Sequence, residues 1–145
     1  MFIYHLFDPK GFKAWETTNP TSDLDDQIVE DIINTDCQVL FAYTTTVYFQ
    51  RLVNIFDLIK VRAPNITIAV GGPHATYAHE HTIRKNSIDY LCRGEGEIAI
   101  LQLVELIEGH RSELPPGIYR KSGDLIEGQG FGTLVANLDD LPYPD

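Results

Sequence analysis

Three polar or glycine-rich segments, each after an apolar, strand-like run, contain the residues best suited to bind a ligand. Tyr43 to Thr46 offers hydroxyls that can donate and accept hydrogen bonds. Gly71 to Thr76 begins with two residues whose missing Cβ atoms let a ligand approach the main chain. Arg93 to Glu97 places two carboxylates among glycines, which disfavours phosphate binding. Each segment also has a structural explanation, namely capping by one threonine, a tight turn, and a turn before an acidic helix start.

These segments would meet at one place if the strands before them are parallel, because parallel strands end at the same edge of a sheet. The thirty residues Ile68–Glu97 contain two such strand ends in one βαβ unit. The candidate site residues are therefore Tyr43, Thr44, Thr45, Thr46, Gly71, Gly72, Pro73, His74, Ala75, Thr76, Gly94, Glu95 and Gly96.

Apolar periodicity predicts the elements that position these residues. We expect strands at Phe2–Phe7, Gln38–Tyr43, Ile68–Val70 and Ile88–Cys92. We expect helices after Ser22, from about Leu52 to a point before Pro64, at Ala78–Lys85 and at Ile98–Ile107. Such alternation predicts an α/β fold, namely a flavodoxin-like (Rossmann-like) three-layer arrangement around a parallel sheet with right-handed crossovers.

The two ends of the chain depart from this pattern. The first strand leads into a loop, and one interpretation is that a first βα unit is missing. Ile118–Arg120 and Leu125–Glu127 flank a Ser122-Gly123 turn and predict a C-terminal β-hairpin that extends one edge of the sheet. We expect one domain over residues 1–128 and a linker over residues 129–145.

Composition excludes several classes of function. A formal net charge of −10 over 145 residues argues against nucleic acid as a partner. No apolar run approaches the roughly 20 residues that cross a bilayer, so we expect no membrane span and a cytoplasmic protein. Cys37 and Cys92 are too far apart in sequence to form a metal or cluster site and are expected to be small buried hydrophobes. His79 and His81 would point to different faces of a helix, so we expect no metal site there. No Ser, His or Asp constellation with a recognisable nucleophile motif is present, so we expect no catalytic residues in this chain.

Several motifs taken together resemble one family. In order they are the threonine-rich strand exit, VGGPHAT at 70–76, DYLCRGEGE at 89–97, GIYRKSGDLIE at 117–127 and LDDLPYPD at 138–145. This combination is similar to the cobalamin (vitamin B12)-binding domain of radical S-adenosylmethionine enzymes, the group that includes the anaerobic magnesium-protoporphyrin IX monomethyl ester oxidative cyclase. The resemblance covers roughly Leu24 to Asp145.

The resemblance implies that cobalamin lies on the carboxyl edge of the sheet, with its nucleotide tail among the strand ends. Tyr43–Thr46 and Gly71–Thr76 would contact the tail or the corrin edge, and Arg93–Glu97, with Gly94, Glu95 and Gly96 as its site residues, would lie on the same rim. The Asp-x-His-x-x-Gly signature of related domains is absent, which implies base-off cobalamin without a histidine ligand from this chain.

The resemblance also implies where catalysis would occur. No Cys-x-x-x-Cys-x-x-Cys is present, and LDDLPYPD resembles the connector before a cluster-binding barrel. An iron–sulfur cluster and S-adenosylmethionine would then belong to a domain after Asp145. The parent protein would be a radical S-adenosylmethionine oxidoreductase or methyltransferase similar to the cyclase. This chain alone would not be an enzyme.

Two other interpretations stay open. A structural or docking module of the same fold that does not bind cobalamin is favoured by Tyr43, which stands where small residues are common, and by the missing first unit. An incomplete sheet edge could pair with the same edge of a second copy, so a homo-oligomer is one expected form of the protein. A receiver-like or flavodoxin-like signalling domain would need an acidic cluster or a phosphate loop at the strand ends, and the sequence has neither.

Overall fold

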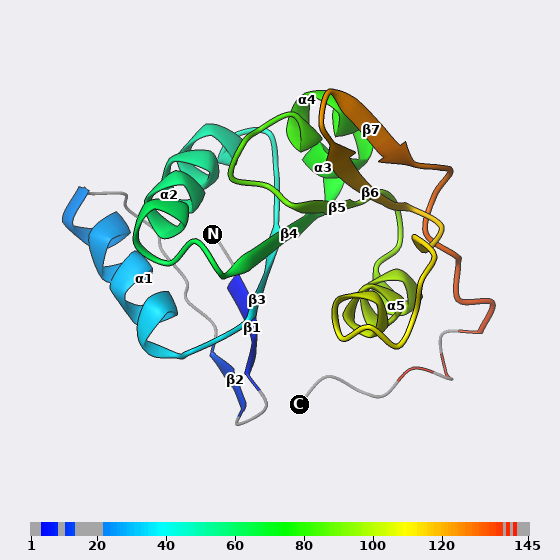
Figure 1. Cartoon of the computed structure of the whole chain (residues 1–145), viewed down its shortest axis with the longest axis horizontal. Helices are drawn as coiled ribbons and strands as arrows, with labels where there is room; N and C mark the ends of the chain where they lie inside the picture. Colours follow the sequence, from blue (N-terminus) through cyan, green and yellow to red (C-terminus); the bar gives the residue numbers. More distant parts are fainter. Residues whose placement is uncertain (1–3, 9–10, 14–21, 138, 140, 142–145) are drawn as a thin grey trace.

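In the computed structural model, the chain folds into a seven-stranded sheet with helices on both faces (Figure 1). The structure describes residues 4–8, 11–13, 22–137, 139 and 141. The strand order is β2-β1-β3-β4-β5-β6-β7. The strands are β1 Tyr4–Asp8, β2 Gly11–Lys13, β3 Val39–Tyr43, β4 Thr67–Gly71, β5 Tyr90–Cys92, β6 Ile118–Ser122 and β7 Leu125–Gly128. The helices are α1 Ser22–Asn34, α2 Phe49–Arg62, α3 Pro73–Tyr77, α4 His79–Ile83 and α5 Glu97–Ile107.

The sheet is parallel at its centre, over β3, β4 and β5, as the strand–helix alternation predicts, and antiparallel pairs flank this centre on both sides. β1 pairs antiparallel with β3 and also with β2. Only two residues separate β1 from β2, and so short a connection can join antiparallel strands but not parallel ones. β2 therefore runs in the same direction as β3, and α1 provides the crossover between them.

Most of the other expected elements are confirmed, with shifts at their ends. The first strand lies at Tyr4–Asp8, and residues 2 and 3 of the expected range lie outside the described residues. β6 and β7 form the expected antiparallel hairpin at one edge. Sequence reasoning missed β2, and it missed α3, which begins at Pro73 because proline is well suited to the first position of a helix.

The two faces of β4 carry side chains of different size. Ile68 and Val70 of β4 point into the larger core, which also contains residues of α1, α2, α3 and α4. Ala69 points to the opposite face and joins a smaller cluster with Cys92 and α5. Figure 1 shows α5 on that face, apart from the other helices. The larger core anchors the sheet, and the face with small residues leaves room under α5.

Candidate functional site

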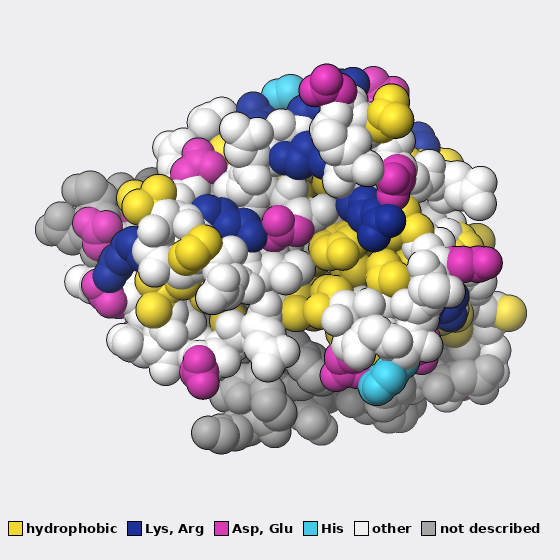
Figure 2. Space-filling view, viewed as in Figure 1, with side chains coloured by type: hydrophobic (Ala, Val, Ile, Leu, Met, Phe, Trp, Pro, Cys, Tyr) yellow, Lys and Arg dark blue, Asp and Glu magenta, His cyan; other side chains and the backbone are white. Residues whose placement is uncertain are grey.

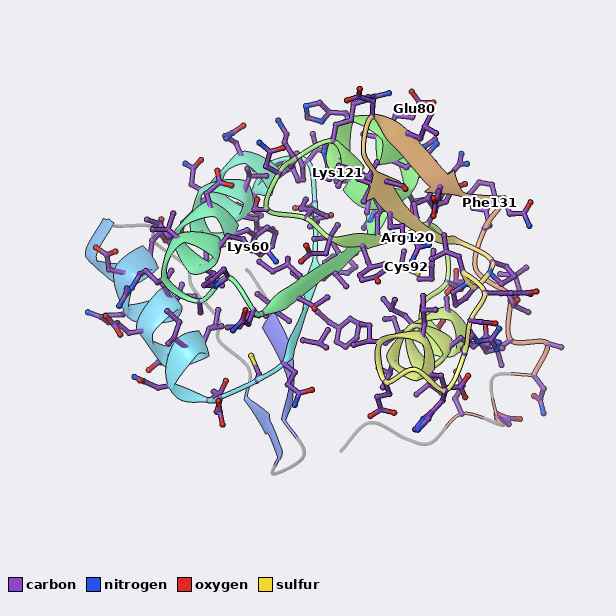
Figure 3. The ribbon with its side chains drawn as sticks, in the orientation of Figure 1. Lys60, Glu80, Cys92, Arg120, Lys121 and Phe131 are labelled. Carbon is purple, nitrogen blue, oxygen red and sulfur yellow. The ribbon has the colours of Figure 1, made fainter. Side chains whose placement is uncertain are left out.

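A cavity of about 770 Å³ lies between the sheet and α5 and extends to the carboxyl ends of β3, β4 and β5. Phe41, Ala69 and Cys92 contribute to its wall from the strands, and Ile100 and Val104 contribute from α5. Figure 2 shows hydrophobic side chains gathered in this part of the molecule, and Figure 3 shows Cys92 between β5 and α5. An apolar cavity of this size is typical of sites for small organic ligands.

Six of the expected site residues line this cavity: Tyr43, Gly71, Gly72, Gly94, Glu95 and Gly96. Glu97, the last residue of the expected rim segment Arg93–Glu97, also lines the cavity. Sequence reasoning missed the rest of the lining, which is Phe41, Ala42, Ala69, Val70, Cys92, Ile100, Leu101, Leu103, Val104 and Glu105. A signal was present in the alternation of large and small residues from Ile68 to Gly71, which leaves one face of β4 without bulk. Hydrophobicity alone does not separate these two faces.

Gly71 and Gly72 are neighbours in sequence but are required for different reasons. A Cβ atom on Gly71 would lie 3.8 Å from the Cβ of Cys92, an ordinary van der Waals contact, so the position faces available space. Gly72 has φ 92° and ψ −176°, a region that almost only glycine adopts. A Cβ on Gly72 would also lie 2.9 Å from the carbonyl oxygen of Thr44 and from the Tyr43 ring. Gly72 is therefore required by the fold, while Gly71 leaves space for a ligand.

The three threonines after β3 differ in what their side chains do. Thr44 is fully buried, and its hydroxyl donates to the carbonyl oxygen of Gly71 at 2.9 Å. Thr45 is half-buried, and its carbonyl oxygen accepts from the Tyr48 amide at 3.2 Å. Thr46 is exposed, and its hydroxyl lies 3.1 Å from Nδ1 of His74. Thr44 therefore ties the end of β3 to the end of β4, and Thr46 presents a hydroxyl to the exterior.

His74 is buried beneath this edge, as is its neighbour Ala75 in α3. Its ring stacks on Phe49 with the centroids 4.0 Å apart, and its Nε2 has no hydrogen-bond partner among the residues that the structure describes. Burial lowers the pKa of His74 below its usual value, and the nearby positive charges of His81 and Lys85 lower it further. The imidazole is therefore neutral near pH 7 and is held by packing on one side and by Thr46 on the other.

The Arg93–Glu97 loop forms the opposite rim of the site. Gly94 has φ 89°, which confirms the backbone turn expected there, and its amide donates to Oγ1 of Thr76 at 3.1 Å. The guanidinium of Arg93 donates to the carbonyl oxygen of Thr76 at 3.3 Å and lies 4.2 Å from the centre of the Phe131 ring. The amide of Gly132 donates to the carbonyl oxygen of Arg93 at 2.8 Å, so the segment after β7 packs on this loop.

Both cysteines are buried and neither forms a disulfide bond within the described residues, in line with the small buried hydrophobes that the sequence predicts. Burial raises the pKa of Cys92 to about 11, with smaller contributions from the carboxylates of Glu97 and Glu95. His79 packs near Tyr119, whereas His81 lies toward His74, so the two side chains point in different directions as expected. Within the described ranges, no group of three or more His, Cys, Asp or Glu side chains is placed to hold a metal ion.

The fold and the cavity together define an α/β domain that can receive an organic ligand at the carboxyl ends of its parallel strands. The chain belongs to the B12 binding domain family, whose model matches residues 13–104. This membership confirms the family resemblance expected from the motifs.

No helix among the described residues is long and apolar enough to cross a membrane.

Relatives of this chain include two methyltransferases and a cyclase that are much longer than it. It is 33% identical over 111 residues to an uncharacterized methyltransferase from Pyrococcus horikoshii, covering 75% of this chain and 24% of the relative. It is 32% identical over 133 residues to the cobalamin-dependent radical SAM methyltransferase TokK from Streptomyces tokunonensis, and this match covers 86% of this chain and 18% of the relative. It is 33% identical over 73 residues to the anaerobic magnesium-protoporphyrin IX monomethyl ester cyclase from Synechocystis, covering 48% and 14%. The chain thus spans about a quarter or less of these proteins.

A similar fold occurs in a solved structure, that of the cobalamin-dependent S-adenosylmethionine radical enzyme OxsB with aqua-cobalamin and S-adenosylmethionine bound. The TM-score is 0.64 at 17% identity, and the match covers 76% of this chain and 16% of that one. At this identity the likeness concerns the fold, and it confirms the flavodoxin-like class that the sequence predicts.

Proposed function

We propose that this domain holds cobalamin at the carboxyl edge of its sheet and presents it to a radical S-adenosylmethionine domain of the parent enzyme. The observation that carries the proposal is the cavity of about 770 Å³ under α5, in a chain of the B12 binding family. The residues present fit such a cofactor. Ala69 and Gly71 leave the cavity hollow, and Gly94 and Gly96 bring main chain without side chains to its mouth.

The proposal assigns different parts of the ligand to different site residues. Those that line the cavity would surround the part that enters it: Tyr43, Gly71, Gly72, Gly94, Glu95 and Gly96. The residues around the edge would face the corrin ring: Thr45, Thr46, Pro73 and Thr76. His74 is buried beneath them and would support the edge from inside. Thr44 and Ala75 are fully buried, so their part would be to hold the edge in shape. When bound, cobalamin supplies a cobalt centre suited to one-carbon transfer or redox chemistry.

We further propose that the cobalamin is base-off and receives no histidine ligand from this chain. The burial of His74, whose Nε2 faces protein, supports this. The iron–sulfur cluster and S-adenosylmethionine would be held by another domain, with residues 129–145 as the linker toward it. Two free, buried cysteines are usual in a reducing compartment and support a cytoplasmic location. The edge strands β2 and β7 would be the places for self-association.

A docking module without cobalamin is the second candidate. Tyr43 is 54% exposed and lines the cavity, so its ring could fill space that a ligand would need. The antiparallel β1 beside β3 also differs from the expected arrangement of the domain. This candidate predicts a stable fold with no corrinoid bound, whatever residue stands at the cavity wall.

Titration with hydroxocobalamin tests the two candidates. The 145-residue chain is mixed with the corrinoid, and binding is followed by the change in its visible spectrum and by co-elution in gel filtration. Binding with a base-off spectrum supports the proposal. Failure of the folded chain to bind the corrinoid would refute it and leave the docking module.

A further inference from the structure

The segment that follows β7 packs against the outer side of the cavity's rim. We call its first four residues, 129–132, the strap. The Tyr119 hydroxyl donates to the carbonyl oxygen of Gly130 at 2.9 Å. The amide of Gly132 donates to the carbonyl oxygen of Arg93 at 2.8 Å. Figure 1 shows the chain passing from β7 toward the side of α5. The strap is thus bonded to the hairpin at one end and to the rim of the cavity at the other.

Glycines allow the strap to lie this close to the rim. A Cβ on Gly132 would lie 2.0 Å from the carbonyl oxygen of Glu95, and a Cβ on Gly117 would lie 2.1 Å from the amide nitrogen of Gly132. The Phe131 ring covers Gly94, where a Cβ would lie 3.2 Å from the ring. Main chain therefore packs directly on main chain, so a change in the path of the rim displaces the strap.

Arg93 joins the strap, the hairpin and α3. Its guanidinium lies 4.2 Å from the centre of the Phe131 ring, a distance at which a cation is attracted to the ring face. The same group donates from Nε to the carbonyl oxygen of Thr76 at 3.3 Å and from Nη1 to the Tyr119 hydroxyl at 3.4 Å. Tyr119 in turn donates to the strap. One side chain therefore contacts every element that surrounds this side of the rim.

Four residues of the Arg93–Glu97 loop line the cavity from its inner side, namely Gly94, Glu95, Gly96 and Glu97. The strap contacts the same loop from outside. The two glycines give the loop's main chain more freedom than other residues would, and the two glutamates are exposed. A ligand that binds a loop already ordered by the strap therefore loses less conformational entropy than one that binds a loop without the strap.

We propose that packing of the strap is coupled to occupancy of the cavity, with Arg93 as the positioning residue that holds the strap and the loop together. This inference rests on the proposed function for the identity of the ligand. Coupling of this kind is reciprocal, so a bound ligand holds the strap in place and a packed strap raises the affinity for the ligand. The filled domain then has a fixed connection to the chain after residue 132, and the empty domain has a looser one.

Amide hydrogen exchange, measured by NMR with and without hydroxocobalamin, tests the effect of the ligand on the strap. The Gly132 amide reports on the strap, because its acceptor is the carbonyl oxygen of Arg93. Saturating hydroxocobalamin should slow its exchange about five- to tenfold, at the lower end of known couplings between sites. The Asp36 amide, which donates to Ile33 in the turn after α1, is the control and should exchange at an unchanged rate. The visible spectrum of the same sample shows whether the corrinoid is bound.

Substitutions in the strap and at Arg93 test the reverse effect. Phe131→Leu removes the aromatic ring, and Arg93→Met removes the cation and its donors at similar length. Each should weaken hydroxocobalamin binding at least two- to fivefold, which is about the worth of one exposed cation–π contact, and each should reduce the slowing at Gly132. Arg93→Lys keeps a cation above the ring and should lie between Arg93→Met and the wild type. Arg62→Met in α2, whose guanidinium pairs with Glu30, is the matched control and should bind as the wild type does.

Two further readouts separate coupling from a structural role. If Arg93 only stabilised the fold, Arg93→Met would lower the melting temperature, but the ratio of Gly132 exchange rates with and without corrinoid would stay as in the wild type. Phe131 is 55% exposed, so Phe131→Leu should fold even if Arg93→Met does not. Thermal melting of each variant shows that the affinities are compared on folded protein.

The outcomes distinguish the coupling from the proposed function. Slower exchange at Gly132 in the wild type, together with weaker binding by Phe131→Leu, supports the coupling. Corrinoid binding that leaves the Gly132 exchange rate unchanged would overturn the coupling while the proposed function stands. Wild-type affinity and wild-type slowing in Phe131→Leu would overturn it in the same way. Absence of corrinoid binding by the folded wild type would instead refute the proposed function, and the coupling with it.

Discussion

Substitution of Gly71 and Gly72 separates ligand binding from folding at the end of β4. A Cβ on Gly71 meets nothing closer than 3.8 Å, and glycine in a strand is about 0.5–1 kcal/mol less favourable than alanine. Gly71→Ala should therefore raise the free energy of unfolding by up to that amount, or the melting temperature by roughly 2–5 °C. Gly71→Val should be at least as stable as the wild type, because its methyl groups have the cavity to enter.

Gly72→Ala should have the opposite effect on stability. The backbone region of Gly72 costs other residues about 1–3 kcal/mol. The added Cβ would also lie 2.9 Å from the Thr44 carbonyl oxygen and the Tyr43 ring. We expect a total loss of about 2–4 kcal/mol, measured by urea denaturation. A bulky residue at Gly72 therefore tests the fold, and the informative position for binding is Gly71.

Hydroxocobalamin titration then tests the cavity. Valine at position 71 occupies ligand space, and overpacking of about 1–3 kcal/mol corresponds to roughly 5- to 150-fold weaker binding by Gly71→Val. Gly123→Ala in the hairpin turn, where the added Cβ meets nothing within 4 Å but φ is +62°, is the control for a change in stability without a change in the cavity. Wild-type affinity in Gly71→Val, or wild-type stability in Gly72→Ala, would refute the reasoning.

Three further predictions concern the rim and the core. The pKa of Cys92 is raised from 9.0 to about 11, so the stability that its neutral thiol contributes is complete below pH 9 and lost as the pH rises to 11. Between pH 9 and pH 11, the free energy of unfolding measured in urea should fall by about 2–3 kcal/mol more in the wild type than in Cys92→Ala. Equal losses in the two proteins would contradict this. A Cβ on Gly132 would overlap the Glu95 carbonyl oxygen. Gly132→Ala should therefore release the segment after β7 and speed its amide hydrogen exchange about tenfold. Unchanged exchange would show that this packing does not hold the segment. Asp89→Ala removes the acceptor for Lys60 at 2.6 Å and for a β4 amide and should lower the free energy of unfolding by about 1–2 kcal/mol, whereas Asp89→Asn, which keeps an acceptor oxygen, should lose less.

Local patterns in the chain were enough to predict the central βαβ elements, the hairpin and the edge at which the site lies. Periodicity of 2 or 3.6 residues and the turn chemistry of glycine and proline act over a few residues, so sequence reasoning can detect them. The same reasoning missed α3, because it treats Gly71–Thr76 as a turn or a ligand-binding strand exit and places the next helix at Ala78–Lys85. Pro73 in fact begins a helix at the first position.

The roles of the individual site residues depend on neighbours far away in the chain. Thr44 is buried because its hydroxyl reaches Gly71 across 27 positions, and Thr76 accepts from Gly94 across 18. The direction of β1 and the packing of Gly132 on Glu95 also depend on which segments meet.

The sequence by itself determined the family, the α/β class and the glycine-rich and hydroxyl-rich strand exits. Only the tertiary structure decided which exits line the cavity, which glycine the fold requires and which threonine hydroxyls bond within the protein. The reason is physical: strand and turn preferences are properties of adjacent residues, whereas a cavity and the direction of a hydrogen bond are properties of atoms that folding brings together.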